Sequence, residues 1–349
     1  MVKVSILMAV YNTAEYLPQC LDSLLDQTMS DFQVICVDDA SNDDSLKVLE
    51  SYARRDSRIE VISLAENHGQ AFARNQGLKR AQGTYTCFLD SDDWLGKDAL
   101  QQIVSAFEQD ETTDSVLFRC RYYYSEDRIE EYPMPDFEKK DKEAAVSVDG
   151  QPVALSGEQA FELSLTWKIH GVYAVKTSIH LQYPYDDSSR SYSDDNITRL
   201  HYLASRKVVA CGGAYFYRQH AASVTHQISS RRFDYLKANA TMMAELRRLK
   251  VSSHLLKVYE NERWKNVVGV YLFYWQYAHE LSDADRREGL RIIRNSWKSI
   301  DFRMIFPENK YKLGFLSCRS SLLPEGICWR LFRLQANLYF VLKKITGKL

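Results

Sequence analysis

Short apolar runs alternate with helical patterns over the first 125 residues, and this alternation limits the folds that the chain can adopt. Apolar runs at 4–10, 32–37, 59–64, 84–89 and 115–124 predict buried strands. Between them apolar residues recur at helical spacing, as in Leu17, Leu21 and Leu24. Strands and helices that alternate over short connections predict βαβ units, and therefore an α/β fold with a largely parallel sheet.

Composition and charge exclude several classes of protein. The length of 349 residues suits two or three domains, and the 45% hydrophobic content excludes a disordered chain. A net charge of -1 gives no reason to expect a nucleic-acid partner. The 7 cysteines are scattered and never form CxxC, which argues against disulfides or zinc and favours a reducing compartment. No apolar run is long enough to span a membrane, and none resembles a signal peptide, so we expect a cytoplasmic protein.

Polar residues follow the predicted strands where each strand ends. Tyr11 follows the first strand, Asp39 the second, and Asp90, Asp92 and Asp93 the fourth. In a parallel sheet the carboxyl ends of strands meet at one edge, where ligands bind. Two acids separated by one residue suit a hard cation such as Mg²⁺ or Mn²⁺, which also binds substrate phosphates. The alternative is that Asp-rich turns only end strands and cap helices, and we favour it for Asp43 and Asp44.

Glycine-rich phosphate loops are absent from the sequence. No GxGxxG follows the first strand, and no GxxxxGK[ST] occurs anywhere. Dinucleotide-binding and P-loop proteins depend on those loops, so neither class is supported.

Several motifs follow one another over about the first 100 residues. They are Val4–Asn12, Tyr16-Leu17 with Cys20–Leu24, Val37–Asp43, Asn67 with Gly69, Ala73–Leu78, Ala81–Tyr85 and Phe88–Trp94. In this order and spacing they resemble the family 2 glycosyltransferases of the GT-A fold. The resemblance implies a Rossmann-like, mainly parallel sheet with flanking helices. It also implies inverting transfer of a sugar from a nucleotide-diphosphate sugar, commonly a UDP-sugar, to an acceptor hydroxyl in polysaccharide or glycolipid synthesis.

The resemblance also implies roles for individual residues in donor binding. The family residue that matches Asp39 contacts the uracil, and the Asp90-Ser91-Asp92 unit matches a DxD motif whose last acid binds Mn²⁺ or Mg²⁺. Asp93 is a second candidate for that metal. Ala9 departs from the proline or threonine of many members. The donor-binding candidates are Ala9, Tyr11, Asp39, Asn67, Arg74, Asp90, Ser91, Arg218 and His220.

The catalytic base is expected in the second half of the chain. Asp195 matches the family's catalytic Asp, and Asp194 replaces the usual Glu. The alternative, that both residues only cap a helix, is compatible with catalysis because a helix N-terminus keeps a carboxylate ionised. Trp167 and His170 are candidates for the acceptor site, although core packing is favoured for Trp167. Residues 125–156 are interpreted as a flap over the acceptor site or, preferably, as a solvated loop.

The remaining expectation concerns domains and the chain end. We expect a nucleotide-sugar half at 1–115, an acceptor half at 116–228 for a glycan or lipid-linked acceptor, and a helical region at 229–349. Residues 326–349 hold no acid and five basic residues. Their apolar stripe comprises Ile327, Leu331, Leu334, Leu338, Val341, Leu342 and Ile345. Such a helix suits the anionic cytoplasmic face of the inner membrane, and the alternatives are docking on its own domain or on a twin subunit in a homodimer.

Rival functions remain open at the sequence level. A catalytically inactive nucleotide-sugar binding or scaffold protein would share the fold, but the carboxylates expected for catalysis are all present. A nucleotide-dependent oxidoreductase would need the missing glycine-rich turn. A nucleotidyltransferase would release diphosphate instead of a nucleoside diphosphate.

Overall fold

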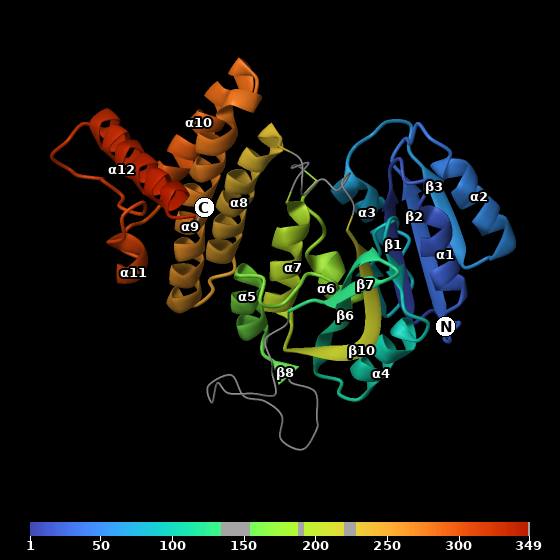
Figure 1. Cartoon of the computed structure of the whole chain (residues 1–349). Coiled ribbons are helices and arrows are strands. Elements are labelled where there is room, and N and C mark those ends of the chain that lie inside the picture. The colour runs from blue at the N-terminus through green and yellow to red at the C-terminus, as the bar shows by residue number, and fades with distance from the viewer. Residues whose placement is uncertain (134–153, 188–191, 220–227, 348–349) are drawn as a thin grey trace. The chain divides into compact units, whose positions relative to one another are not determined.

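The computed structural model describes residues 1–133, 154–187, 192–219 and 228–347. It divides into two compact units, Met1–Ser223 and Val224–Leu349. The first unit is built on a β-sheet and the second is helical (Figure 1). Most of the predicted flap at 125–156 lies outside the described residues, as does His220.

The sheet of the first unit combines a parallel half with a mixed half. Among the described residues its strand order is β3-β2-β1-β4-β9-β6-β10-β5. The parallel half contains β1 (Val4–Val10), β2 (Phe32–Asp38), β3 (Ile59–Ser63) and β4 (Tyr85–Phe88). The other strands are β5 (Trp94–Leu95), β6 (Thr113–Ser125), β7 (Arg128–Glu131), β8 (Ala154–Leu155), β9 (Tyr173–Lys176) and β10 (Lys207–Arg218). The five predicted strands are therefore confirmed. The expectation of a largely parallel sheet holds only for the first half, because β9 runs antiparallel to both β4 and β6.

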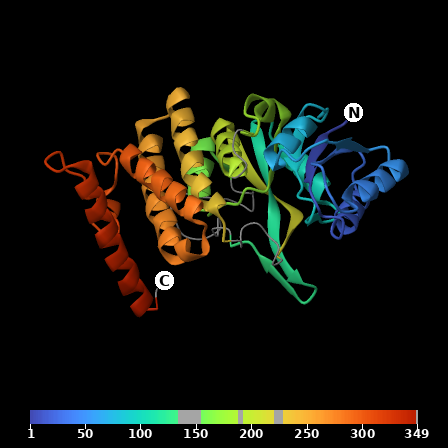
Figure 2. The same ribbon diagram turned by 90° about the horizontal axis from the view of Figure 1, so that it is seen from above.

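Side chains of the buried strands alternate between two faces, and helices cover both. Ile6 and Met8 pack with α1 (Leu17–Leu25), α2 (Ser45–Arg55) and α4 (Ala99–Glu108). Leu7, between them, packs on the other face with α3 (Gln70–Leu78). The second half of the unit adds α5 (Gly157–Leu165), α6 (Thr177–Gln182) and α7 (Ser193–Ala204). Figure 2 shows the paired ends of β6 and β7 extending beyond the rest of the sheet.

The second unit consists of helices around an aromatic core. Its helices are η2 (Ser230–Phe233), α8 (Asp234–Arg248), α9 (Ser253–Tyr277), η3 (Ala278–Glu280), α10 (Asp283–Ser299), α11 (Pro307–Lys310) and α12 (Glu325–Ile345). Trp264, Trp297 and Phe332 are each no more than 1% exposed. The indole N–H of Trp297 donates to the carbonyl of Ser317 at 3.1 Å, so this buried donor is satisfied. Among the helices that the structure describes, none is long and apolar enough to cross a membrane.

Gly83 lies where the chain approaches β1 most closely. The sequence pattern predicts a helix that continues to Gly83, but α3 ends at Leu78 and a turn follows. A Cβ atom on Gly83 would lie 2.7 Å from the backbone nitrogen of Ser5, and the Gly83 N–H donates to the Ser5 hydroxyl at 2.8 Å. This glycine is therefore required by packing against the β1 backbone rather than by a helix end.

We predict that Gly83→Ala destabilises the first unit by about 1–3 kcal/mol, because backbone atoms of β1 would have to move. Gly269 in α9 is exposed, and a Cβ atom added to it would meet no other atom within 4 Å. Gly269→Ala should therefore stabilise the second unit by about 0.5–1 kcal/mol. Chemical denaturation of both variants measures this, and equal effects of the two substitutions would contradict the packing argument.

His170 is a buried, neutral side chain and not an exposed acceptor-site residue. It is 3% exposed, and its Nδ1 accepts the N–H of Val172 at 3.2 Å. Its ring contacts Tyr132 edge to face, with centroids 5.0 Å apart. Burial lowers the pKa of His170 to about 4 and does the same for His201.

A lowered folded-state pKa makes the stability of this unit depend on pH. The unfolded chain takes up a proton on His170 near pH 6.5, whereas the folded protein resists until about pH 4. The contribution of His170 to the free energy of unfolding is therefore fully present above pH 6.5 and is lost as the pH falls towards 4. Relative to His170→Asn, the wild type should lose roughly 1–2 kcal/mol between pH 7 and pH 5 in chemical denaturation. Parallel pH profiles would contradict this assignment.

Candidate functional site

The carboxyl ends of β1, β2 and β4 meet at one edge of the sheet, as the sequence predicted. Val10 pairs with Asp38 across β1 and β2, and Leu7 pairs with Phe88 across β1 and β4. The Thr13 hydroxyl donates to the hydroxyl of Ser91 at 2.9 Å, which ties the segment after β1 to the acidic turn after β4. The polar residues that follow these three strands therefore form one cluster.

Asp39 is buried beneath this edge and holds the loop before α3. Its carboxylate accepts the backbone N–H of His68 at 2.8 Å and that of Gly69 at 2.7 Å. The side-chain amide of Asn67 donates to the Asp39 carbonyl at 3.1 Å. Asp39 is 2% exposed, so its carboxylate is already bonded inside the protein in this structure. The predicted donor residues Asp39 and Asn67 are thus brought together.

Arg74 is buried and forms an ion pair with the partly exposed Asp90. It is 2% exposed, and its guanidinium donates to the Asp90 carboxylate. The guanidinium also lies over the rings of Phe88 at 4.3 Å and Tyr185 at 5.3 Å. Gln70 donates to the same Asp90 oxygen at 3.1 Å. Arg74, which was predicted to bind the donor, is therefore paired in this structure with the acid that follows β4.

The pKa of Asp90 depends on its burial and on the charged groups around it. Burial raises the pKa of Asp90, the Arg74 guanidinium lowers it, and the nearby carboxylates of Asp92 and Asp194 raise it again. The net pKa is above the usual value for aspartate. Asp194 comes from the start of α7, about 100 residues further along the chain. The structure thus brings the acids of the β4 turn and of α7 into electrostatic reach of one another.

Asp93 is directed into the protein, whereas Asp92 is partly exposed. The Asp93 carboxylate accepts the hydroxyl of Tyr215 at 2.7 Å and the backbone N–H of Arg218 at 2.8 Å. Asp93 is 1% exposed, and burial together with the charges of Asp90 and Asp92 raises its pKa well above the usual value. These contacts favour a structural role for Asp93 and leave Asp92 as the stronger candidate for a metal ligand.

Arg218 holds the backbone of the acidic turn. Its Nε donates to the carbonyl of Asp92 at 2.8 Å, and its terminal nitrogen donates to Gln19. The guanidinium also lies over Trp94 at 4.8 Å and Tyr123 at 5.4 Å. Arg218 is partly exposed, so its predicted role in donor binding is compatible with these contacts, which position the turn.

Asp195 lies in the first turn of α7, beside a buried arginine. Its carboxylate lies 3.7 Å from the guanidinium of Arg199, with the Asp195 side chain 14% exposed. The Arg199 guanidinium lies over the Trp167 ring at 5.5 Å. Trp167 is 40% exposed and has a backbone φ of 54°, so the expectation that it packs in the core is wrong. Its exposed ring, linked to Asp195 through Arg199, is the surface that an acceptor sugar could stack on.

The remaining donor candidates lie around the same edge. Tyr11 is 46% exposed directly after β1, and Ala9 is partly buried in that strand. Ser91 is 5% exposed and bonded to Thr13.

Two contacts of the site were not predicted from the sequence. Tyr215, which accepts the N–H of Asp90 at 3.3 Å, lies more than 120 residues away in the chain. Tyr185 contacts Arg74 from a segment without any recognised motif. Only the folded arrangement of β4, β10 and α3 brings these residues to the acids.

The described residues contain no group of three or more His, Cys, Asp or Glu side chains suited to hold a metal. A magnesium-type ion usually keeps water and substrate phosphates as ligands and needs only one or two carboxylates. Asp92, partly exposed beside the crowded acids, fits a site of that kind.

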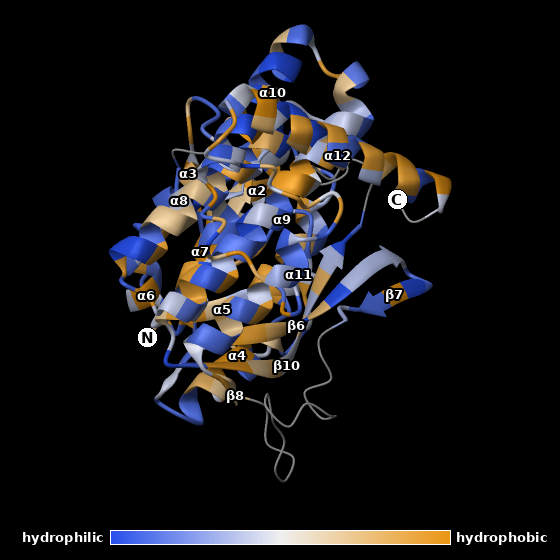
Figure 3. Ribbon diagram, turned by 90° about the vertical axis from the view of Figure 1, so that its left-hand side faces the viewer, coloured by the Kyte–Doolittle hydropathy of each residue, from blue (hydrophilic) through white to orange (hydrophobic). Residues whose placement is uncertain are grey.

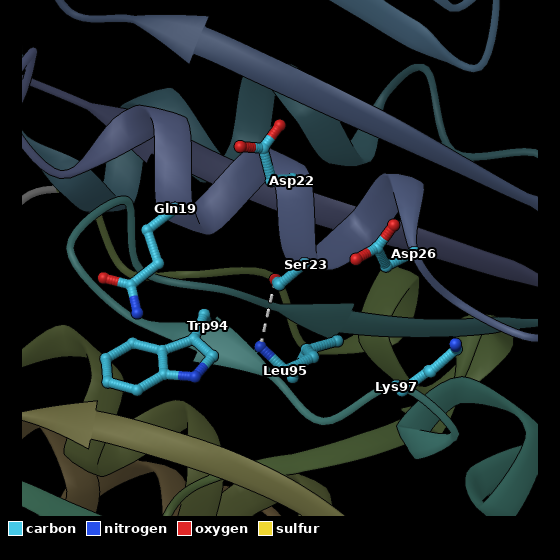
Figure 4. A pocket seen from close by; sticks show the side chains of 7 residues that line it. All are labelled: Gln19, Asp22, Ser23, Asp26, Trp94, Leu95 and Lys97. Carbon is cyan, nitrogen blue, oxygen red and sulfur yellow. Dashed lines mark hydrogen bonds between the residues drawn. The ribbon is translucent and has the colours of Figure 1, made fainter. Parts of the chain in front are cut away.

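A separate hollow of about 450 Å³ lies between α1 and β5 (Figure 4). Its lining residues are Gln19, Asp22, Ser23, Asp26, Trp94, Leu95 and Lys97. The hydroxyl of Ser23 accepts the N–H of Leu95 at 3.1 Å across it. It contains none of the predicted donor-binding residues, so the donor is not assigned to it.

Comparisons with known structures identify the fold. The structure of S. aureus TarS 1-349 in complex with UDP-GlcNAc aligns with a TM-score of 0.71 at 16% identity, covering 99% of this chain and 93% of that one. Mannosyltransferase PcManGT from Pyrobaculum calidifontis, in complex with GDP-Man and Mn²⁺, aligns with a TM-score of 0.52 at 14% identity, covering 99% and 88%. At such identities the likeness shows the fold alone, which is the GT-A type that the sequence predicted.

Sequence comparisons find similar proteins that are named glycosyltransferases. Uncharacterized glycosyltransferase EpsJ of Bacillus subtilis (strain 168) is 38% identical over 135 residues, which are 39% of this chain and 38% of EpsJ. The chain thus spans about two fifths of the length of that relative. Glycosyltransferase GlyG of Streptococcus pneumoniae serotype 4 is 24% identical over 233 residues, covering 63% of this chain and 72% of GlyG. Residues 5–155 match the sequence model of glycosyl transferase family 2. Residues 5–155 of the chain are therefore similar to glycosyl transferase family 2 proteins.

Proposed function

We propose that this chain is an inverting, metal-dependent glycosyltransferase that uses a nucleotide-diphosphate sugar, most simply a UDP-sugar. The observation that carries the proposal is the acidic turn at the carboxyl end of β4, where Asp90 is paired with the buried Arg74 and Asp92 is partly exposed. The family match and the GT-A fold support it. TarS, which shares the fold, has been crystallised with UDP-GlcNAc, and this makes a UDP-sugar the first donor to test.

Asp92 is the residue that we expect to hold Mn²⁺ or Mg²⁺ together with the donor diphosphate. When bound, such a metal stabilises the negative charge that develops on the diphosphate as the bond to the sugar breaks. The chain itself supplies the position of the acidic turn. Arg74 orients Asp90, and Arg218 holds the carbonyl of Asp92. Asp39 and Asn67 shape the loop against which the nucleoside is expected to lie.

Asp195 is proposed as the base that accepts the proton of the acceptor hydroxyl. A helix N-terminus and a neighbouring guanidinium both favour an ionised carboxylate, which is the form that can take a proton. Attack by the hydroxyl oxygen on the anomeric carbon then displaces the nucleoside diphosphate from the opposite face. A single displacement of this kind inverts the configuration at that carbon.

We infer that the acceptor is a glycan or a lipid-linked sugar of a cell-surface polymer. Among the relatives, the putative teichuronic acid biosynthesis glycosyltransferase TuaG of Bacillus subtilis is 44% identical over 99 residues. The exposed Trp167, which contacts the arginine paired with Asp195, offers a stacking surface for such an acceptor. The proposed division places donor residues mainly in 1–115 and acceptor residues in 116–228.

The activity is tested directly by release of nucleoside diphosphate from UDP-GlcNAc, UDP-glucose and GDP-mannose, with Mn²⁺ and with a chelator. Metal-dependent release from one donor supports the proposal. Binding of a nucleotide sugar without release, in the presence of glycan acceptors, would instead support an inactive binding protein on the same fold.

Asp92→Asn should lower metal-dependent turnover at least about a hundredfold, because the metal would lose its protein carboxylate. Asp26→Asn is the matched control, since Asp26 is exposed at the end of α1 and lies in the separate hollow. Initial rates across a Mn²⁺ titration measure the effect. Wild-type turnover in the Asp92 variant would remove that residue from the metal site.

Asp195→Asn should lower kcat by roughly 10²–10⁴-fold while leaving the affinity for donor unchanged, because an amide cannot accept the proton. Asp194→Asn leaves the proposed base in place, so its kcat should fall much less. Steady-state kinetics together with UDP binding separate the two effects. A normal kcat for the Asp195 variant would assign the base to another residue.

A further inference from the structure

Helix α12 has two apolar faces on opposite sides, where the sequence suggested a single stripe. One face packs into the core of the second unit through Cys328, Trp329, Phe332, Ala336 and Phe340. The opposite face carries the predicted stripe, whose side chains are exposed. Figure 3 shows hydrophobic and hydrophilic residues alternating along the ribbon of α12. The outer stripe is defined here as Ile327, Leu331, Leu334, Leu338, Val341 and Ile345.

The outer stripe is long and unusually exposed. Its six side chains are between 41% and 76% exposed, and Leu342 beside them is 44% exposed. They follow one another at alternating spacings of four and three residues, so they form a straight line along a helix of 21 residues, roughly 30 Å long. Contiguous apolar surface of this kind on a folded protein usually marks an interaction site. Figure 2 shows no other described helix of the unit over the outer side of α12.

Basic residues border the outer stripe. Arg330 and Lys344 are exposed and lie on one side of it. Arg333 lies on the same side, where its Nε approaches the hydroxyl of Tyr271 at 3.3 Å. The acid of the helix, Glu325, is paired with Arg294 at 2.6 Å and with Lys298 at 2.7 Å. No Asp or Glu follows it in the printed sequence, so the charged side chains that α12 itself places beside the stripe are basic.

The basic residues beside the stripe distinguish two candidates that could cover it, a second copy of α12 and an anionic surface. A stripe with four-three spacing also suits a coiled coil, in which flanking charges select the partner. Two copies of α12 would bring Arg330 and Lys344 against residues of the same sign or against neutral residues. An anionic surface, in contrast, satisfies the basic border and covers the apolar stripe at once.

We propose that the outer stripe of α12 lies in the interfacial layer of an anionic lipid bilayer, with the helix axis parallel to the membrane plane. The inference is independent of the glycosyl transfer proposed above, since it rests only on the second unit. Because the opposite face of α12 is part of the core, the helix is a fixed anchor of its unit and not a free tail. Removing it would uncover Trp297 and Tyr271, so single side chains must be changed instead of deleting the helix.

The test is co-sedimentation of the full chain with vesicles of equal parts phosphatidylglycerol and phosphatidylcholine, compared with phosphatidylcholine alone. We expect binding to the anionic vesicles that weakens in high salt. Leu334→Glu with Leu338→Glu should weaken it at least about tenfold, because two apolar side chains no longer enter the interface. Arg330→Gln with Lys344→Gln should weaken it about fivefold for each charge. Leu181→Glu, at a 58% exposed leucine of α6, is the matched control and should bind like the wild type.

Unfolding midpoints establish that the variants are folded. If Leu334→Glu with Leu338→Glu is unstable, Leu334→Gln with Leu338→Gln is used in its place. Wild-type binding by a folded outer-stripe variant would overturn the proposal, and so would absence of wild-type binding to anionic vesicles. Analytical ultracentrifugation addresses the other occupant. A wild-type dimer that becomes monomeric in Leu334→Glu with Leu338→Glu, without vesicle binding, would assign the stripe to a second copy of the chain.

Discussion

Repulsion among carboxylates at one sheet edge is the constraint on which the first unit depends. Asp90, Asp92 and Asp93 occupy four consecutive positions with Ser91, and burial together with the neighbouring carboxylates raises the pKa of Asp90 and of Asp93. The fold accommodates each of these three carboxylates in a different way. Asp90 is paired with a guanidinium, and Asp93 is buried against a tyrosine hydroxyl and a backbone N–H. Asp92 stays partly exposed, where a cation from solution would complete the neutralisation.

The buried Arg74 connects this electrostatic problem to the fold. Removing a guanidinium from water is costly, and the Asp90 carboxylate and two aromatic faces compensate for it. Arg74 is on α3, Phe88 on β4, and Tyr185 in the segment before α7. The neighbouring Asn75 fixes that segment further, since its side chain bonds both the carbonyl and the N–H of Tyr185 at 2.8 and 3.0 Å. Loss of the arginine alone would leave the partly exposed Asp90 carboxylate without its guanidinium partner, so Arg74 links the position of this acid to the packing of three elements.

The sequence predicted those parts of the fold that local patterns encode. Short runs of β-branched and apolar residues located the five strands, and the rule for strand ends located the acidic cluster. Contacts between distant segments left no such pattern, as with Tyr215 and Asp93 or Tyr185 and Arg74. Trp167 was misjudged because a large aromatic residue is more often buried, whereas here its side chain is 40% exposed. In α12 the sequence pattern revealed one stripe, but only packing shows that the core takes the other face.

Calorimetric titration with UDP, in the presence of Mn²⁺ and again with a chelator, tests the central claim most directly. The acidic edge predicts that UDP binds in a metal-dependent manner, since the diphosphate and the cation would together neutralise Asp92 and its neighbours. Binding of GDP or CDP in place of UDP would keep the site and change the donor. Absence of binding by any nucleoside diphosphate, with either Mn²⁺ or Mg²⁺, would contradict the account.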